Sequence, residues 1–100
     1  MNNSFQEEIA SMKDWLVEIR RTIHMHPELM FEEVETSRLV SAWLGKFGLE
    51  VKTGWAKTGV VGLLQGGKKG KTVAIRADMD ALPLEEATQV PYTSKIKGKM

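Results

Sequence analysis

The chain has 100 residues, enough for one small domain or for part of a larger one. Lys and Arg number 14 and Asp and Glu number 13, and this net charge of +1 argues against a nucleic-acid-binding protein, which usually carries a basic excess. No apolar run approaches the length of a membrane span, and zero cysteines exclude disulfides and thiolate metal sites and favour a cytoplasmic protein.

Two amphipathic helices are predicted in the first half of the chain. Apolar residues recur at three- and four-residue steps over residues 5–23, which predicts one helix of about five turns that ends before Pro27. A second apolar stripe over residues 39–47 predicts another helix, which stops at Gly48. Both stripes are expected to pack into a core.

Three strands are predicted after the helices, at residues 49–53, 60–64 and 72–77. The glycine-rich segment 66–70 is expected to be a hairpin turn that makes the second and third strands antiparallel neighbours. The third strand is nearly all apolar, as in a strand that is covered on both faces of a wider sheet. The fold class is therefore α/β, with two helices followed by three strands, and residues 1–100 are expected to be one incomplete domain.

Two titratable clusters favour a structural role. His24 and His26 would point about 200° apart on a helix, so we expect them to lie at a helix end or in the core and not to bind one metal ion. Glu85 and Glu86 fall in a predicted loop, and solvated charge is the expected role for both.

Asp78 and Asp80 are the main candidates for a functional site. They are two residues apart at the carboxyl end of the predicted third strand, so both would point to the same face, at the end where α/β sheets build their sites. Such a pair can bind metal, act as a general base or orient other ligands. It can also cap the turn before Pro83, because aspartate readily hydrogen-bonds its own backbone.

Several motifs occur in order along the chain. They are Ile19–Leu29, Phe31–Glu33, Glu35–Ser37, Thr58–Gly62, Arg76–Pro83 and Pro91–Tyr92. Together, over about residues 14–100, they resemble the N-terminal portion of the amidohydrolase branch of the aminoacylase/carboxypeptidase-type metallopeptidases. Hippurate hydrolase, N-acyl-amino-acid amidohydrolases and indole-3-acetyl-amino-acid hydrolases belong to that branch.

The resemblance implies a zinc-peptidase-like catalytic domain with an inserted lid domain and a two-metal centre of zinc or manganese. It implies hydrolysis of the amide bond of N-acyl amino acids, with Asp80 as the catalytic aspartate that supports the metal centre. Asp78 stands where sister branches have a histidine ligand, so it is a weaker metal candidate. The family's other ligands and its general-base glutamate come after residue 100.

The 100 residues alone are therefore expected to bind no metal tightly and to be inactive. Two alternatives stay open, a truncated non-catalytic fragment and a protein-binding module. No nucleic-acid or membrane partner is expected. The uncovered apolar third strand predicts self-association into a homo-oligomer.

Overall fold

A computed structural model describes residues 3–100 of the chain. The chain forms two compact units. One consists of the residues up to Pro27 together with Pro83–Met100, and the other is Glu28–Leu82. Within the described residues, no helix is both long enough and apolar enough to cross a membrane.

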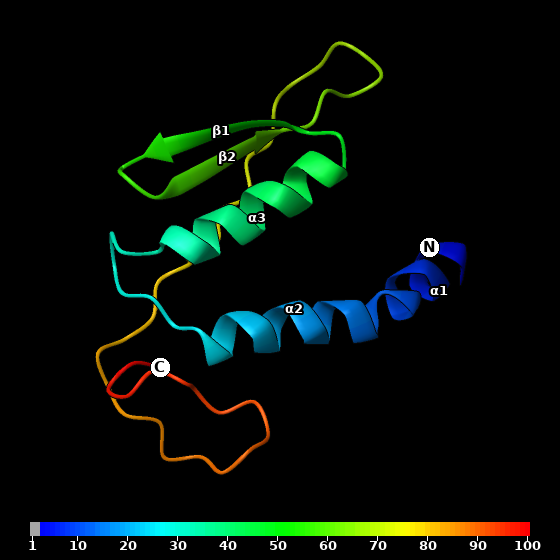
Figure 1. Ribbon diagram of the computed structural model, residues 1–100. Helices are drawn as coiled ribbons and strands as arrows, with labels where there is room; N and C mark the ends of the chain where they lie inside the picture. The colour runs from blue at the N-terminus through cyan, green and yellow to red at the C-terminus, as the bar shows by residue number, and fades with distance from the viewer. Residues whose placement is uncertain (1–2) are drawn as a thin grey trace. The chain divides into compact units, whose positions relative to one another are not determined.

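The first unit contains two consecutive helices, α1 (Asn3–Ser11) and α2 (Lys13–Met25) (Figure 1). The single helix predicted over residues 5–23 is therefore wrong, because the main chain turns at Met12. The Ser11 hydroxyl donates a hydrogen bond of 2.6 Å to the Glu8 carbonyl, and such a bond back to the preceding turn often bends a helix. The C-terminal segment lies beside the end of α2, where the Lys95 amide donates to the Met25 carbonyl at 2.9 Å.

The second unit consists of a helix on a β-hairpin. The helix α3 (Val34–Lys46) packs on β1 (Glu50–Trp55) and β2 (Gly59–Leu63), which pair antiparallel (Figure 1). Gly48 follows α3 with φ +82°, so the predicted stop is confirmed. The first two predicted strands are also confirmed.

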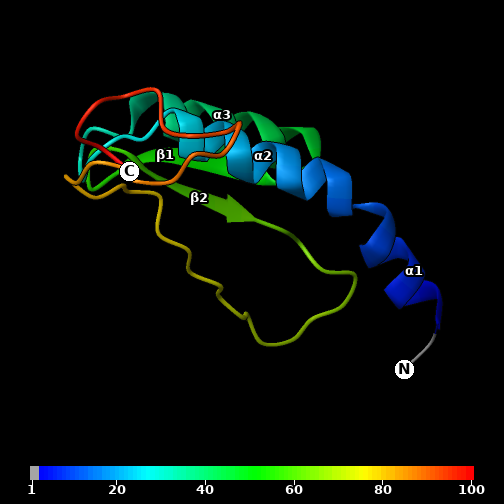
Figure 2. The same ribbon diagram turned by 90° about the horizontal axis from the view of Figure 1, so that it is seen from below.

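The predicted third strand, residues 72–77, is absent. The chain after β2 runs as a long loop (Figure 2), and Val73 and Ile75 are 85% and 96% exposed. A strand requires a ladder of hydrogen bonds with a neighbour, and no segment of residues 3–100 provides one. The predicted hairpin turn at 66–70 is wrong for the same reason, since β2 pairs with β1 and not with the later segment.

The described residues contain no buried hydrophobic side chain. The apolar stripes expected to form a core are only partly covered: Ile19 and Leu44 have intermediate exposure, whereas Phe5 and Leu16 are 60% and 47% exposed. Instead, the polar residues that are buried as whole residues are Glu33 and Thr36, at the start of α3, which are 8% and 5% exposed. Units this small bury only part of the apolar surface that a larger domain removes from water.

Candidate functional site

Asp80 lies beside the turn that precedes α3. The amide of the next residue, Ala81, donates a hydrogen bond of 2.8 Å to the carbonyl of Glu28, and Leu29 and Ala81 form an isolated parallel bridge. The Asp80 side chain itself is exposed and has no hydrogen-bond or ion-pair partner among residues 3–100. Its carboxylate is therefore available to a group outside the described part of the chain.

Asp78 has different surroundings. The Arg76 guanidinium contacts its Oδ1 through Nη2 at 3.2 Å and through Nε at 3.3 Å. Both side chains are largely exposed, so this ion pair contributes at most about 1 kcal/mol. The two aspartates therefore differ in the structure: Asp78 is paired with Arg76, and Asp80 is unpaired within residues 3–100.

Glu28 caps the start of α3 from outside the helix. Its Oε1 accepts hydrogen bonds from the Thr36 amide and the Thr36 hydroxyl, both at 2.7 Å, and its Oε2 accepts one from the Glu35 amide at 3.1 Å. Glu33, the residue directly before α3, makes no capping hydrogen bond with its side chain. Glu28 therefore takes the role that a local capping residue usually has.

The capping hydrogen bonds change the acidity of Glu28. Partial burial raises the pKa of its carboxyl, but the hydrogen bonds from the Thr36 hydroxyl and from the Thr36 and Glu35 amides lower it more. The net pKa therefore lies below the usual range of a glutamate, and the group is held as a carboxylate. A negative charge at this place also complements the positive end of the helix dipole.

A second cluster joins α2 to the C-terminal segment within the first unit. Glu86 Oε1 accepts a hydrogen bond from His24 Nε2 at 2.9 Å and one from the Ser94 amide at 2.7 Å. The Tyr92 ring packs edge-on against the His24 ring, with centroids 6.0 Å apart, and the Arg21 guanidinium lies 4.2 Å above the Tyr92 ring.

The prediction that Glu86 is a solvated loop charge is wrong, because its side chain is only 3% exposed. The Thr88 hydroxyl, the Ser94 amide and His24 hydrogen-bond to this carboxylate and hold its pKa below the usual range. Glu85 also has a partner, since its carboxylate accepts a hydrogen bond from the Gly98 amide. His24 lies in the last turn of α2, so the predicted helix-end position is confirmed.

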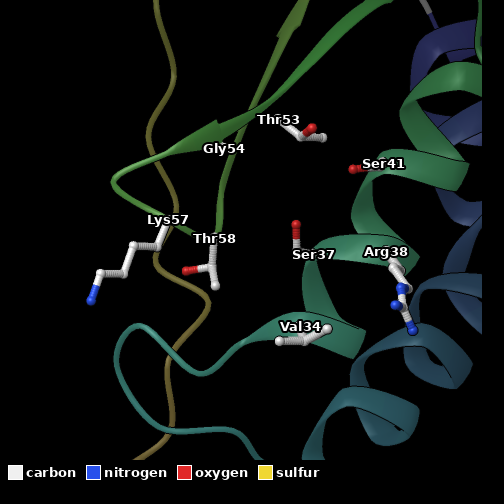
Figure 3. Close-up of a pocket in the computed structure, with 8 residues that line it drawn as sticks. All are labelled: Val34, Ser37, Arg38, Ser41, Thr53, Gly54, Lys57 and Thr58. Carbon is white, nitrogen blue, oxygen red and sulfur yellow. The ribbon is translucent and has the colours of Figure 1, made fainter.

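A shallow hollow of about 440 Å³ lies between α3 and the hairpin (Figure 3). It is lined by Val34, Ser37, Arg38, Ser41, Thr53, Gly54, Lys57 and Thr58. Figure 3 shows the two cationic side chains, Arg38 and Lys57, directed outward to opposite sides. None of the lining residues carries a carboxylate or an imidazole, so the hollow offers no general base.

The residues described do not form a metal site by themselves. No group of three His, Asp or Glu side chains within residues 3–100 converges in a way that could hold a metal ion. His24 contacts Glu86, whereas Nδ1 of His26, the residue after α2, lies 2.9 Å from the carbonyl of Thr22 in that helix. The roles predicted for Asp80 and Asp78 at a metal centre therefore stay predictions.

Sequence reasoning did not find Glu28 or Glu86 as structural residues. Glu28 reaches a helix that starts six residues later, and Glu86 reaches a histidine 62 residues away. The absence of Ser, Thr, Asp or Asn directly before α3 is the one sequence signal that a distant cap was needed.

No protein-family model matches the chain. Thermostable carboxypeptidase 2 of Saccharolobus solfataricus is 50% identical over 96 residues, which cover 95% of this chain and 24% of that protein. Hippurate hydrolase of Campylobacter jejuni is 47% identical over 93 residues, covering 93% of this chain and 24% of that protein. The crystal structure of a dinuclear metal-binding peptidase of the M20 family from Bacillus subtilis matches with a TM-score of 0.85 and 41% identity, over 91% of this chain and 26% of that one. The chain is therefore similar to M20 family hydrolases.

The chain spans about a quarter of the length of the M20 relatives that it matches. It corresponds to the N-terminal portion of M20 amidohydrolases and peptidases, as the motifs predicted. The α/β fold class is confirmed by the similarity to the M20 peptidase structure, although the third strand expected here does not form.

Proposed function

We propose that the full-length protein containing this sequence is a metal-dependent hydrolase that cleaves the amide bond of N-acyl amino acids. The observation that carries the proposal is the similarity to hippurate hydrolase, whose substrate is an N-acyl amino acid. The dinuclear metal binding stated for the M20 peptidase supports a divalent metal, for which we propose zinc or manganese. We also infer that residues 1–100 belong to one catalytic domain.

Within this reaction we assign Asp80 to the support of the metal centre, with Asp78 as a weaker ligand candidate. The unpaired, exposed carboxylate of Asp80 supports that assignment, and the contact of Asp78 with Arg76 weakens the case for Asp78. The remaining ligands must come from outside residues 3–100, so the 100 residues alone are expected to be inactive. The lack of cysteine supports a cytoplasmic location.

A carboxypeptidase activity is the second candidate, because a relative of that name is 50% identical to this chain. Both activities cleave an amide bond next to a free carboxylate. They differ in the group on the other side of that bond, which is a simple acyl group in one case and a peptide in the other.

The test is a substrate panel with the purified full-length protein. N-benzoyl, N-acetyl and indole-acetyl amino acids are compared with short peptides, each after chelation and after addition of zinc or manganese. We expect metal-dependent turnover that is faster on the N-acyl amino acids, and its near-complete loss in Asp80→Ala. Faster turnover of peptides would favour the carboxypeptidase, and metal-independent turnover would refute the proposal.

A further inference from the structure

We propose that Glu28 is a positioning residue for Asp80. Its carboxylate accepts hydrogen bonds from the first turn of α3, and its main-chain carbonyl accepts one from the amide of Ala81, the residue next to Asp80. One residue thus joins the start of a helix to the segment that carries the assigned carboxylate. The functional part of this inference rests on the role proposed for Asp80.

The first attachment is the side chain. Three donors on two residues, the Thr36 amide, the Thr36 hydroxyl and the Glu35 amide, hold both oxygens of the Glu28 carboxylate. Thr36 is 5% exposed, so water competes little for the two hydrogen bonds that this residue donates. Because both oxygens are held, the Glu28 side chain is limited to a narrow range of positions, and its backbone is restrained with it.

The second attachment is the main chain. The Glu28 carbonyl accepts the Ala81 amide at 2.8 Å, and the bridge between Leu29 and Ala81 continues the pairing by one residue. Consecutive Cα atoms are about 3.8 Å apart, so a fixed Ala81 restricts Asp80 to a small volume. The preceding residues form no strand, and the Asp80 side chain has no partner among residues 3–100.

A simple helix cap would behave differently. If Glu28 only stabilised α3, its loss would lower the melting temperature but leave both the mobility around Ala81 and the turnover of the folded molecules unchanged. A positioning role predicts that the Ala81 segment becomes more mobile and that turnover falls together with it. Substrate binding should change little, since Glu28 has no assigned contact with substrate.

The test uses the full-length protein and three variants. Glu28→Ala removes the acceptor oxygens and Glu28→Gln keeps one of them. Glu32→Ala is the matched control, since the exposed Glu32 side chain makes no hydrogen bond or ion pair within residues 3–100. Hydrogen exchange of the peptide segment around Ala81 is measured beside kcat and KM. For Glu28→Ala we expect exchange about tenfold faster and kcat about tenfold lower, the size of effect that loss of a cap produces.

The other variants complete the expected pattern. In Glu28→Ala, KM should stay within about twofold of the unmodified protein. Glu28→Gln should restore most of the slow exchange around Ala81 and most of kcat, and Glu32→Ala should behave as the unmodified protein. Unchanged exchange around Ala81 in Glu28→Ala overturns the inference, and so does faster exchange with unchanged kcat. If Glu28→Ala does not fold, Thr36→Val, which removes one donor, replaces it under the same criteria.

The inference and the proposed function can fail separately. A full-length protein that hydrolyses none of the substrates refutes the proposed function and, with it, a positioning role in that reaction. The exchange measurement needs no activity, so it still shows whether the Glu28 carboxylate holds the Ala81 segment.

Discussion

Replacing Gly59 by alanine should destabilise the protein more than the same change at Gly62 or Gly67. Gly59 opens β2 and pairs with Trp55, the last residue of β1. A Cβ atom built on Gly59 would lie 2.5 Å from the Trp55 carbonyl oxygen and 3.3 Å from its carbonyl carbon. The clash is with backbone, so a side-chain rotation cannot relieve it.

The magnitude follows from the short loop between these two residues. Ala56 and Lys57 both have positive φ, 47° and 74°, so the loop is already held in a conformation that is uncommon for residues with a side chain. Moving the Trp55 carbonyl away from a new methyl group would disturb this loop and the end of the strand pair. Forced insertion of a methyl group costs typically 1–3 kcal/mol, and we expect about 2–3 kcal/mol here.

Two other glycines provide graded controls. A Cβ on Gly62 would lie 3.0 Å from the terminal methyl carbons of Leu44 and Leu49, which can move, so Gly62→Ala should cost about 1 kcal/mol or less. A Cβ on Gly67 would meet nothing within 4 Å, so Gly67→Ala should change the free energy of unfolding by no more than about 0.5 kcal/mol.

The assay is urea unfolding of the full-length protein, with the slope of the transition compared between variants so that a change in midpoint can be attributed to stability. The expected order of destabilisation is Gly59→Ala, then Gly62→Ala, then Gly67→Ala. A free energy of unfolding for Gly59→Ala within about 0.5 kcal/mol of that for Gly67→Ala would refute the reasoning, because it would show that the hairpin turn relaxes freely.

Four further outcomes are expected. Because its pKa is lowered on folding, Glu28 contributes stability that is fully present above the ordinary pKa of a glutamate and is lost as the pH falls through the lower folded pKa. Glu28→Gln should therefore flatten the decline in unfolding free energy measured below about pH 5. His24→Ala should lower the melting temperature of the full-length protein with little loss of rate, whereas Asp80→Ala should do the reverse; equal rate losses would show that His24 is misassigned. The 100-residue chain should hydrolyse no N-acyl amino acid with zinc or manganese added, and turnover by this chain would contradict the incomplete ligand set. The isolated chain should self-associate in light scattering, and serine at both Val73 and Ile75 should reduce this; a sharp monomer peak before any substitution would contradict the prediction.

Local sequence patterns predicted the elements whose hydrogen bonds are local. The helix α3 has an apolar stripe and a glycine two residues after its end. In the hairpin, β1 mixes polar and apolar residues from Glu50 to Thr53, and β2 is a continuous run of apolar residues and glycine. The break at Met12 left no mark on the apolar stripe, because Ile9, Met12 and Leu16 keep helical spacing through the turn. Periodicity reports the spacing of side chains and not the continuity of the main-chain hydrogen bonds.

The contacts around the candidate site could not be predicted in this way. The Glu28 carboxylate and the Thr36 amide are eight residues apart, and His24 and Glu86 are 62 residues apart. No hydrophobic periodicity or short motif specifies these two contacts, since each depends on the path by which a loop returns to a helix. Acidic residues in loops are usually solvated, so sequence reasoning assigned Glu86 to water although it is held by three donors.

The missing third strand shows that the geometry of the candidate site depends on tertiary pairing. Residues 72–77 have the composition of a strand, but strand structure requires a neighbour, and β1 already occupies β2 on one side. Within residues 3–100, this segment is held by a main-chain hydrogen bond only after its end, between Ala81 and Glu28, and it has no strand pairing along residues 72–77. The exposed Val73 and Ile75 therefore mark a segment that can still gain partners, and pairing along it would align Asp78 and Asp80 on one face. The contact with Glu28 sets where this segment ends, and pairing with further chain would set which way its carboxylates point.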